Sequence, residues 1–203
     1  MVPVAQKLLE LHLTEHIVFE GLSFAYTHQP FPTMIDGMTP GYASIQTGQV
    51  WWDASWPFWN NMVDAAVTML GTQHCTLERC RIAHTGGSGV IVSTAVSMDP
   101  PLHYTESNHC QIVECEIFDI GAHGVYLGDE RSIADSVQAP PGQSGAGSDP
   151  SNSLALRRSR IENFAVVYRD SVGVYAGHTR DLVIMNNEIA YGDYDGISVG
   201  TLQ

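Results

Sequence analysis

Basic residues are scarce in this chain. Nine Lys and Arg stand against 22 Asp and Glu among 203 residues, which gives a formal net charge of −13. A surface with this excess of negative charge repels nucleic acid, anionic membranes and bare polyanionic polysaccharides, unless a cation mediates the contact. The imbalance therefore excludes nucleic acid as a partner.

Long hydrophobic runs are also missing. No window approaches the ~18 apolar residues of a membrane-spanning helix, so no span is predicted, and Met1–Leu13 shows no signal peptide. The apolar fraction of 44% is nevertheless too high for a disordered chain. Nineteen glycines and ten prolines, with few Lys and Glu, are typical of a turn-rich β-protein.

One eight-residue pattern occurs five times, with apolar residues at its first, third and last positions. It covers Ile17–Phe24, Cys75–Ile82, Cys110–Ile117, Leu154–Ile161 and Leu182–Ile189. A second pattern, a short strand that begins with glycine, follows each of the last four copies. It covers Gly89–Ser93, Gly124–Gly128, Gly173–Gly177 and Gly196–Gly200.

Short strands that recur with tight turns and no helix between them predict an all-β, right-handed parallel β-helix of about five coils. We expect one domain over residues 1–203, with a Trp-rich insertion at 28–64 and a Gly/Pro/Ser-rich loop at 129–152. Leucines within Met1–Leu13 are expected to cap the first coil. The alternative is a β-sandwich whose repeats are accidental.

The four cysteines fall at equivalent positions of the repeat. Cys75 and Cys110 take the first position, and Cys80 and Cys115 take the sixth, which Ser159 occupies in a later copy. Coils stack in register, so these side chains form inward columns. No histidine or further cysteine converges on them, as a zinc site would need, and we predict packed, reduced thiols.

Several segments carry a family resemblance. They are His16–Phe24, Gly41-Tyr with Gln46, Gly86–Val90, Ser171–Thr179, Asn186–Ile189 and Gly196–Gly200. Together they resemble right-handed β-helix proteins of the pectin-lyase-like fold, and the later segments are similar to bacterial glycoside hydrolases that act on fucosides and xylans. The resemblance implies a secreted, periplasmic or cell-surface protein and further coils beyond this chain. We expect a partial chain whose last coil can associate end to end with another copy.

Candidate catalytic groups lie on the borders of the glycine-led strands. Alignment of the repeats places Asp170 and Asp193 in one column with Asp195 nearby, and Asp129 in another column with His178. Glycosidic cleavage needs two carboxyl groups ~5–9.5 Å apart. These four aspartates are therefore the predicted catalytic set, although Asp is also a common turn residue.

Candidate sugar-binding residues are aromatic or imidazole side chains near the same strands. Tyr126 and Tyr175 align as outward residues, His123 and His178 fall at strand ends, and Trp51 and Trp52 begin a cluster of four tryptophans. Flat rings stack on sugars while their polar atoms bind hydroxyls. The tyrosines can equally be β-formers under a loop, and the tryptophans can form a small core of the insertion.

Two classes of function remain open. The first is a glycoside hydrolase that cleaves a neutral polysaccharide or oligosaccharide without a cofactor. The second is a non-catalytic carbohydrate-binding or adhesin-like module. A polysaccharide lyase is a weaker option, because it needs basic residues or bound Ca²⁺ to stabilise its charged intermediate.

Overall fold

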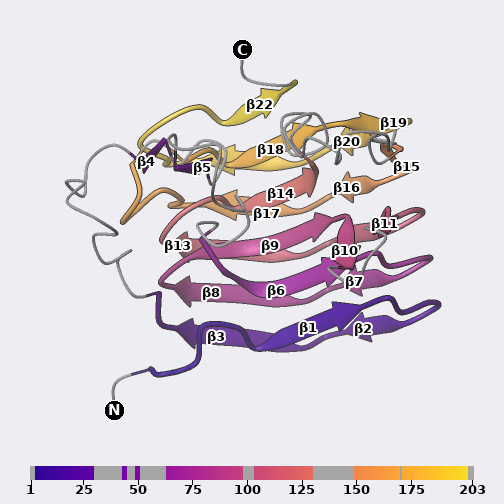
Figure 1. Ribbon diagram of the computed structural model, residues 1–203. Helices are drawn as coiled ribbons and strands as arrows, with labels where there is room; N and C mark the ends of the chain where they lie inside the picture. The colour runs from indigo at the N-terminus through magenta and orange to yellow at the C-terminus, as the bar shows by residue number, and fades with distance from the viewer. Residues whose placement is uncertain are drawn as a thin grey trace.

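The computed structural model describes residues 3–29, 63–97, 103–129, 149–169 and 171–200, together with the short strands β4 (Ala43–Ser44) and β5 (Gln49–Val50). Strands are the only regular secondary structure in these ranges, and they hold no helix suited to crossing a membrane. The strands wind about one axis as stacked coils, with the N-terminal strands at one end and the C-terminal strands at the other (Figure 1).

Each coil contributes one strand to each of three parallel sheets. Sheet 1 contains β1 (Leu9–His12), β6 (Ala65–Leu70), β9 (Ser88–Ser93), β14 (Val125–Gly128), β18 (Val174–Gly177) and β22 (Ile197–Val199). Sheet 2 contains β2 (Val18–Glu20), β7 (Thr76–Glu78), β12 (Gln111–Val113), β16 (Ala155–Arg157) and β20 (Val183–Met185). Sheet 3 contains β3 (Ser23–Thr27), β8 (Arg81–Thr85), β13 (Glu116–Ile120), β17 (Arg160–Glu162) and β21 (Glu188–Ala190). Five coils are complete, as predicted, and β22 begins a sixth.

Shorter pairings lie outside the three sheets. They are antiparallel β10 (Ala95–Ser97) with β11 (His103–Thr105), parallel β15 (Ser151–Asn152) with β19 (Thr179–Arg180), and antiparallel β4 with β5. The Trp-rich insertion and the Gly/Pro/Ser-rich loop fall largely outside the described residues.

The predicted N-terminal cap is wrong. The segment contains strand β1, which pairs with β6 in parallel and in register from Leu9 opposite Val67. The alternation of its leucines explains the difference, because a period of two turns Leu9 and Leu11 toward the core of the coil. Leu11 is buried and Leu9 packs against the central cluster, whereas Leu8 and Leu13 remain exposed.

Single residues in the left-handed region form the bends of the coil. In the second coil these are His74, Arg79 and His84, with φ between 49° and 53°. The same five-residue spacing recurs in all five coils. The other bend residues are His16, Gly21, Tyr26, His109, Glu114, Asp119, Ser153, Arg158, Asn163, Asp181, Asn186 and Tyr191. Each non-glycine residue in this conformation costs about 1–2 kcal/mol.

Side chains at equivalent bends interact from coil to coil. The rings of His16, His74 and His109 stack with centroids 4.8 and 4.7 Å apart. At the next bend, Arg158 Nε donates to Glu114 Oε1 over 2.8 Å. These contacts repeat at the spacing of adjacent strands and offset part of the backbone cost.

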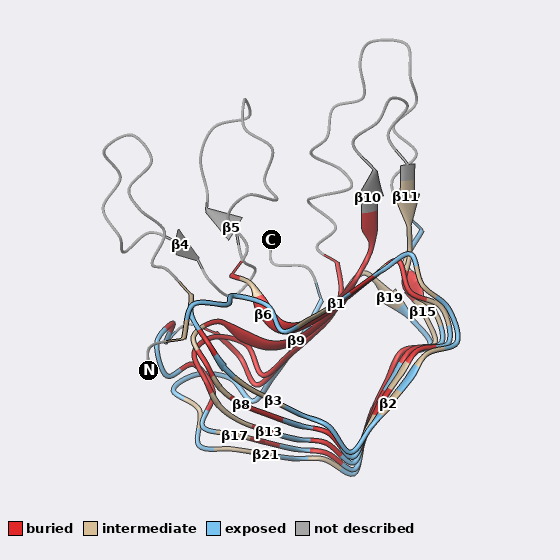
Figure 2. Ribbon diagram, turned by 90° about the horizontal axis from the view of Figure 1, so that it is seen from below, coloured by how far each residue is buried: buried red, intermediate tan, exposed pale blue. Residues whose placement is uncertain are grey.

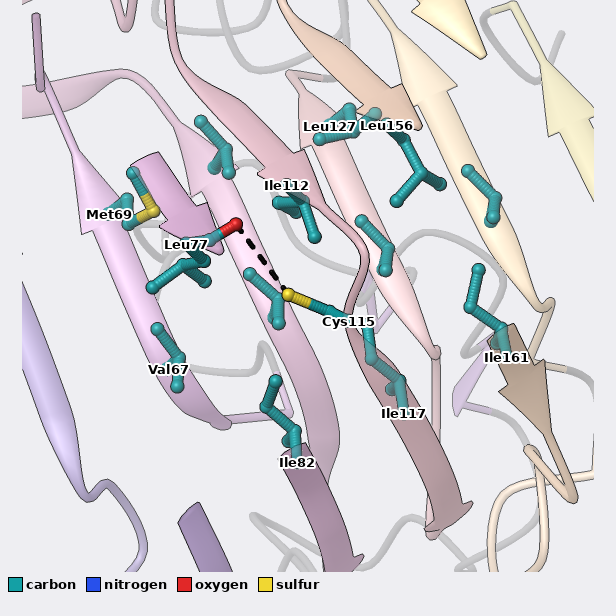
Figure 3. Packing of buried hydrophobic residues seen from close by; sticks show 14 of the residues in the cluster. Val67, Met69, Leu77, Ile82, Ile112, Cys115, Ile117, Leu127, Leu156 and Ile161 are labelled. Carbon is teal, nitrogen blue, oxygen red and sulfur yellow. Dashed lines mark hydrogen bonds between the residues drawn. The ribbon is translucent and has the colours of Figure 1, made fainter. Parts of the chain in front are cut away.

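The residue that follows each middle bend points into the coil and toward the preceding one. Cys115 Sγ donates to the carbonyl of Leu77 over 3.5 Å (Figure 3). Ser159 N donates to Asn187 Oδ1 over 2.8 Å, so the column predicted from the repeats is confirmed. Leu22, in the first coil, is instead 44% exposed.

The four cysteines are free and buried, as predicted. They belong to the central cluster between the sheets, which also contains Leu77, Ile112 and Leu156. Figure 3 shows Cys115 among these side chains. Burial raises the pKa of the Cys110 thiol and raises that of Cys115 to about 11. Both thiols are therefore protonated at neutral pH.

Glycine stands at the start of β9, β14 and β18 because the coils press together there. A Cβ atom on Gly124 would lie 2.6 Å from the carbonyl oxygen of Gly173 and 2.5 Å from Ile161 Cγ2. A Cβ atom on Gly173 would meet Gly196 O at 2.6 Å. Such distances leave no room for a side chain.

Sheet 1 differs from the other two sheets in its burial. Its central strands β6, β9, β14 and β18 are buried along almost their whole length, whereas strands of sheets 2 and 3 such as β7 and β17 have partly or fully exposed residues. Figure 2 looks along the axis and shows the strands of each sheet superposed. Sheet 1 is thus covered on its outer face as well as its inner face.

Candidate functional site

The outer face of sheet 1 carries an aromatic pair. Val125 and Leu127 point into the coil, so Tyr126 between them points outward, and Tyr175 is its partner on β18. The two rings stack with centroids 4.6 Å apart at 24°. They belong to a second buried cluster, separate from the central one.

The register of this face agrees with the repeats. Tyr126 lies opposite Ile91 on one side and Tyr175 on the other, and Tyr175 lies opposite Ser198. Both rings are buried, at 2% and 1% exposure, and Tyr175 Oη donates to the carbonyl of Gly200 over 3.0 Å. The structure therefore shows a packing contact, and sugar binding by this pair stays a prediction.

His123 lies beside the tyrosine pair. Its ring is buried, with centroids 5.9 Å from Tyr126 and 6.4 Å from Tyr175. The backbone N–H of Val172 donates to His123 Nδ1 over 3.1 Å. An Nδ1 atom that accepts a hydrogen bond leaves the proton of the neutral ring on Nε2. The fold thus fixes one tautomer of this histidine.

Asp129 is a buried carboxylate whose hydrogen bonds bind β14 to the preceding coil. It follows β14, and its side chain accepts hydrogen bonds from the hydroxyl groups of Ser93 and Thr94 and, over 3.1 Å, from Thr94 N. The network continues through Ser107, which donates to Ser93 O over 2.7 Å. Three donors hold this carboxylate, so its observed role is to fix the end of the strand.

Asp193 and Asp195 lie at the other border of sheet 1. Both are exposed, and they precede β22, whereas Asp129 follows β14 and turns its side chain toward β9. Along the strand direction, the position of Asp195 comes six residues before the position of Asp129, and six residues of a strand span ~20 Å. The structure therefore does not bring Asp129 together with Asp193 and Asp195, because the length of the strand separates them.

The exposed segment before β22 adds residues that the repeats did not single out. Arg169 Nε lies 3.4 Å from Asp193 Oδ2, and Tyr194, between the two aspartates, is 47% exposed. The alternation of Asp and Tyr in this segment is a signal that sequence reading could have used. Arg169 carried no such signal, since it reaches Asp193 from the neighbouring coil.

Other predicted site residues are only partly placed. His178 follows β18 with φ of 43° and is half-buried, next to Gly177, whose carbonyl accepts from Asp129 N over 3.0 Å. Asp170, Trp51 and Trp52 lie outside the described residues. Their predicted roles therefore stay predictions.

Comparison with known proteins identifies the fold. Residues 102–202 match the family profile described as a right handed beta helix region. The chain is a right-handed parallel β-helix. A solved structure titled "Glycoside hydrolase" matches this β-helix with a TM-score of 0.69 and 19% sequence identity, which shows a shared fold. No curated protein matches the chain.

The β-helix spans only part of that relative. The match covers 98% of this chain and 34% of the solved chain, so the β-helix corresponds to about a third of its length. Among the described residues, no group of three or more His, Cys, Asp or Glu side chains is arranged to hold a metal ion. The functional groups described at the site are carboxylates, tyrosine hydroxyls and one buried imidazole.

Proposed function

We propose that this β-helix is carbohydrate-active and serves as a glycoside hydrolase, or as part of one. The observation that carries the proposal is the pair of exposed carboxylates, Asp193 and Asp195, at the border of sheet 1. Tyr126, Tyr175 and His123 pack together on the outer face of the same sheet. The structure that shares the fold along nearly the whole chain is titled glycoside hydrolase, which supports the assignment.

The proposed reaction uses two carboxyl groups. One protonates the leaving oxygen, and the other attacks the sugar or activates a water molecule, at separations of ~5–5.5 Å or ~6.5–9.5 Å respectively. Asp193 and Asp195 are two residues apart, so their Cα atoms are at most about 7 Å from each other. Their carboxyl groups can therefore flank one glycosidic bond. We include Asp170 in this catalytic set and exclude Asp129.

The proposed substrate is a neutral oligosaccharide or polysaccharide. A net charge of −13 repels negatively charged uronate chains, whereas uncharged sugars are not repelled. Tyr194, and Trp51 and Trp52 of the insertion, offer rings on which a sugar can stack. We propose a secreted, periplasmic or cell-surface location, which the resemblance to β-helix glycoside hydrolases supports.

A non-catalytic carbohydrate-binding module is the second candidate. The observation that favours it is Asp129, because a buried carboxylate held by Ser93 and Thr94 is a structural group rather than a reacting one. This alternative keeps sugar binding at sheet 1 and lacks hydrolysis.

The decisive experiment incubates the 203-residue chain with xylo-, fuco- and other neutral oligosaccharides and measures new reducing ends. We expect hydrolysis of at least one glycan, and a loss of 100-fold or more in two of the variants D170N, D193N and D195N. Asp181→Asn is the matched control, because Asp181 is exposed at a bend before sheet 2. Binding without hydrolysis would favour the second candidate, and neither binding nor hydrolysis would reject both.

A further inference from the structure

Cys80 and Cys115 occupy the same position in neighbouring coils. The residues that follow them, Arg81 and Glu116, are Cα partners, and Glu116 N donates to the carbonyl of Cys80 over 2.9 Å. In-register parallel strands lie ~4.8 Å apart, and disulfides join Cα atoms at about 4.4–6.8 Å. The backbone therefore already holds the two cysteines at bonding distance.

Both side chains point into the coil. Both are almost fully buried, at 2% and 1% exposure, and each follows a bend residue, so their Cα–Cβ bonds are parallel. The thiol of Cys115 is directed at the coil that holds Cys80, where it donates to the carbonyl of Leu77 (Figure 3). The Cys80 thiol donates to the carbonyl of Phe19 over 3.4 Å, so it must turn toward Cys115 for the bond to form.

The second in-register pair differs in its contacts. Gln111 N donates to the carbonyl of Cys75 over 2.9 Å, so Cys75 and Cys110 are also opposite each other. The Cys110 thiol, however, shares a hydrogen bond with Thr72 Oγ1 over 3.2 Å. A side-chain hydroxyl therefore holds the Cys110 thiol, whereas the Cys115 thiol has hydrogen bonds to the backbone carbonyls of Leu77 and Val113.

We propose that Cys80 and Cys115 are an oxidation site and form a disulfide bond between the second and third coils. The oxidant is a small-molecule disulfide such as oxidised glutathione. Because both thiols are buried, the coil must open locally before one cysteine thiolate attacks the oxidant, forms a mixed disulfide and releases one reduced thiol. The second cysteine then attacks the mixed disulfide and releases the other thiol. Two electrons pass to the oxidant, and the two cysteine protons end on the released thiols.

The environment sets the rate of this reaction. Burial raises the pKa of Cys115 to about 11, so little thiolate exists at neutral pH, and the rate rises with pH. The bond encloses the segment 81–114, which carries β10 and β11. Closing a loop of this length restricts the unfolded chain and stabilises the folded one.

The test treats the reduced full-length chain with oxidised glutathione at pH 8.5, blocks the remaining thiols and measures mass. We expect a product lighter by two hydrogen atoms, with a higher melting temperature than the reduced chain. Cleavage after glutamate separates the four cysteines, because Glu78, Glu106 and Glu114 lie between them. The peptide that contains Cys80 should be linked to the peptide that contains Cys115.

Matched variants separate the two pairs. Cys115→Ser should abolish the linkage and still fold, because Ser159 occupies the same column in the next coil. Cys110→Ser should leave the linkage intact, and circular dichroism checks the folding of both variants. A bond between Cys75 and Cys110 alone, or four free thiols after the treatment, would overturn the proposal.

Discussion

One methyl group decides whether neighbouring coils can stack at Gly121. A Cβ atom there would lie 2.2 Å from the carbonyl oxygen of Gly86, which is backbone and cannot move aside cheaply. The same atom on Gly196 would meet nothing closer than Ile189 Cγ2 at 3.6 Å. Two glycines of one small chain thus have opposite tolerance for a side chain.

We predict that Gly121→Ala lowers the free energy of unfolding by about 1–3 kcal/mol, the usual cost of overpacking. Gly196→Ala, its matched control, should change it by less than about 0.5 kcal/mol, because the site is exposed. Urea titrations followed by circular dichroism measure both values. Equal losses in the two variants would contradict the stacking explanation.

Asp129 and Asp193, taken as single residues, also differ in how much they contribute to stability. Asp129 accepts three hydrogen bonds in a buried site, and an amide in its place sets one N–H₂ group against these donors. We predict that Asp129→Asn lowers the free energy of unfolding by about 1–3 kcal/mol. Asp193→Asn should leave stability unchanged, because Asp193 is exposed. Thermal unfolding distinguishes the two, and an unchanged Asp129→Asn variant would remove the structural role.

At the scale of the elements, the buried cysteine columns make the stability of the coil depend on pH. The unfolded Cys115 thiol titrates near 9.0, and burial raises the folded pKa to about 11. A raised folded pKa contributes stability below the unfolded value and loses it as pH rises through the folded one. Stability should therefore fall between pH 9 and pH 11, by at most about 3 kcal/mol from this thiol.

The measurement for this alkaline loss is the urea midpoint across pH 8 to 11. Burial raises the pKa of Cys110 as well, so its contribution has the same sign. Cys115→Ser should flatten part of the decline, because its hydroxyl does not titrate in this range. An identical pH profile in the variant would exclude Cys115 as a source.

The sequence repeats predicted which residues of most strands face inward and how the strands of neighbouring coils are aligned. Inward residues such as Leu77 and Ile112, the cysteine columns and the register of Tyr126 on Tyr175 all follow from a template that repeats at fixed spacing. Strand β1 was missed because it lacks the glycine of the later sheet 1 strands and no copy of the eight-residue pattern precedes it.

The site was harder to predict than the coil. Column alignment states which residues share a strand end, but it does not state which way a side chain turns or what covers it. Asp129 turns back to Ser93, and Tyr126 and Tyr175 are buried although they point outward from the sheet. These outcomes depend on contacts between segments that share no repeat.

At the scale of the whole molecule, β22 is the last described strand of sheet 1. In the part of the chain that the structure describes, β22 pairs with β18 alone, and Val199 is 71% exposed and Ile197 47% exposed. Unpaired backbone and exposed apolar residues on a strand edge favour pairing with another chain. We propose that this edge supports end-to-end association of the 203-residue chain.

Sedimentation velocity over a range of concentrations tests the association. We predict that the chain shows a concentration-dependent rise in mass and that Val199→Lys reduces it, because a charge on an edge strand opposes pairing. Val4→Lys is the control, since Val4 is equally exposed but lies outside the strands. A monomer at all concentrations would contradict the prediction.

The fixed five-residue distance between bends has a practical consequence for protein engineering. Each pair of strands in sheets 2 and 3 is set between three bends, such as His74, Arg79 and His84, and no coil varies this distance. All differences in coil length fall at the two corners that flank sheet 1. Foreign loops should therefore be grafted at those corners, whereas deleting one residue between the bends would misplace every side chain that follows in that coil.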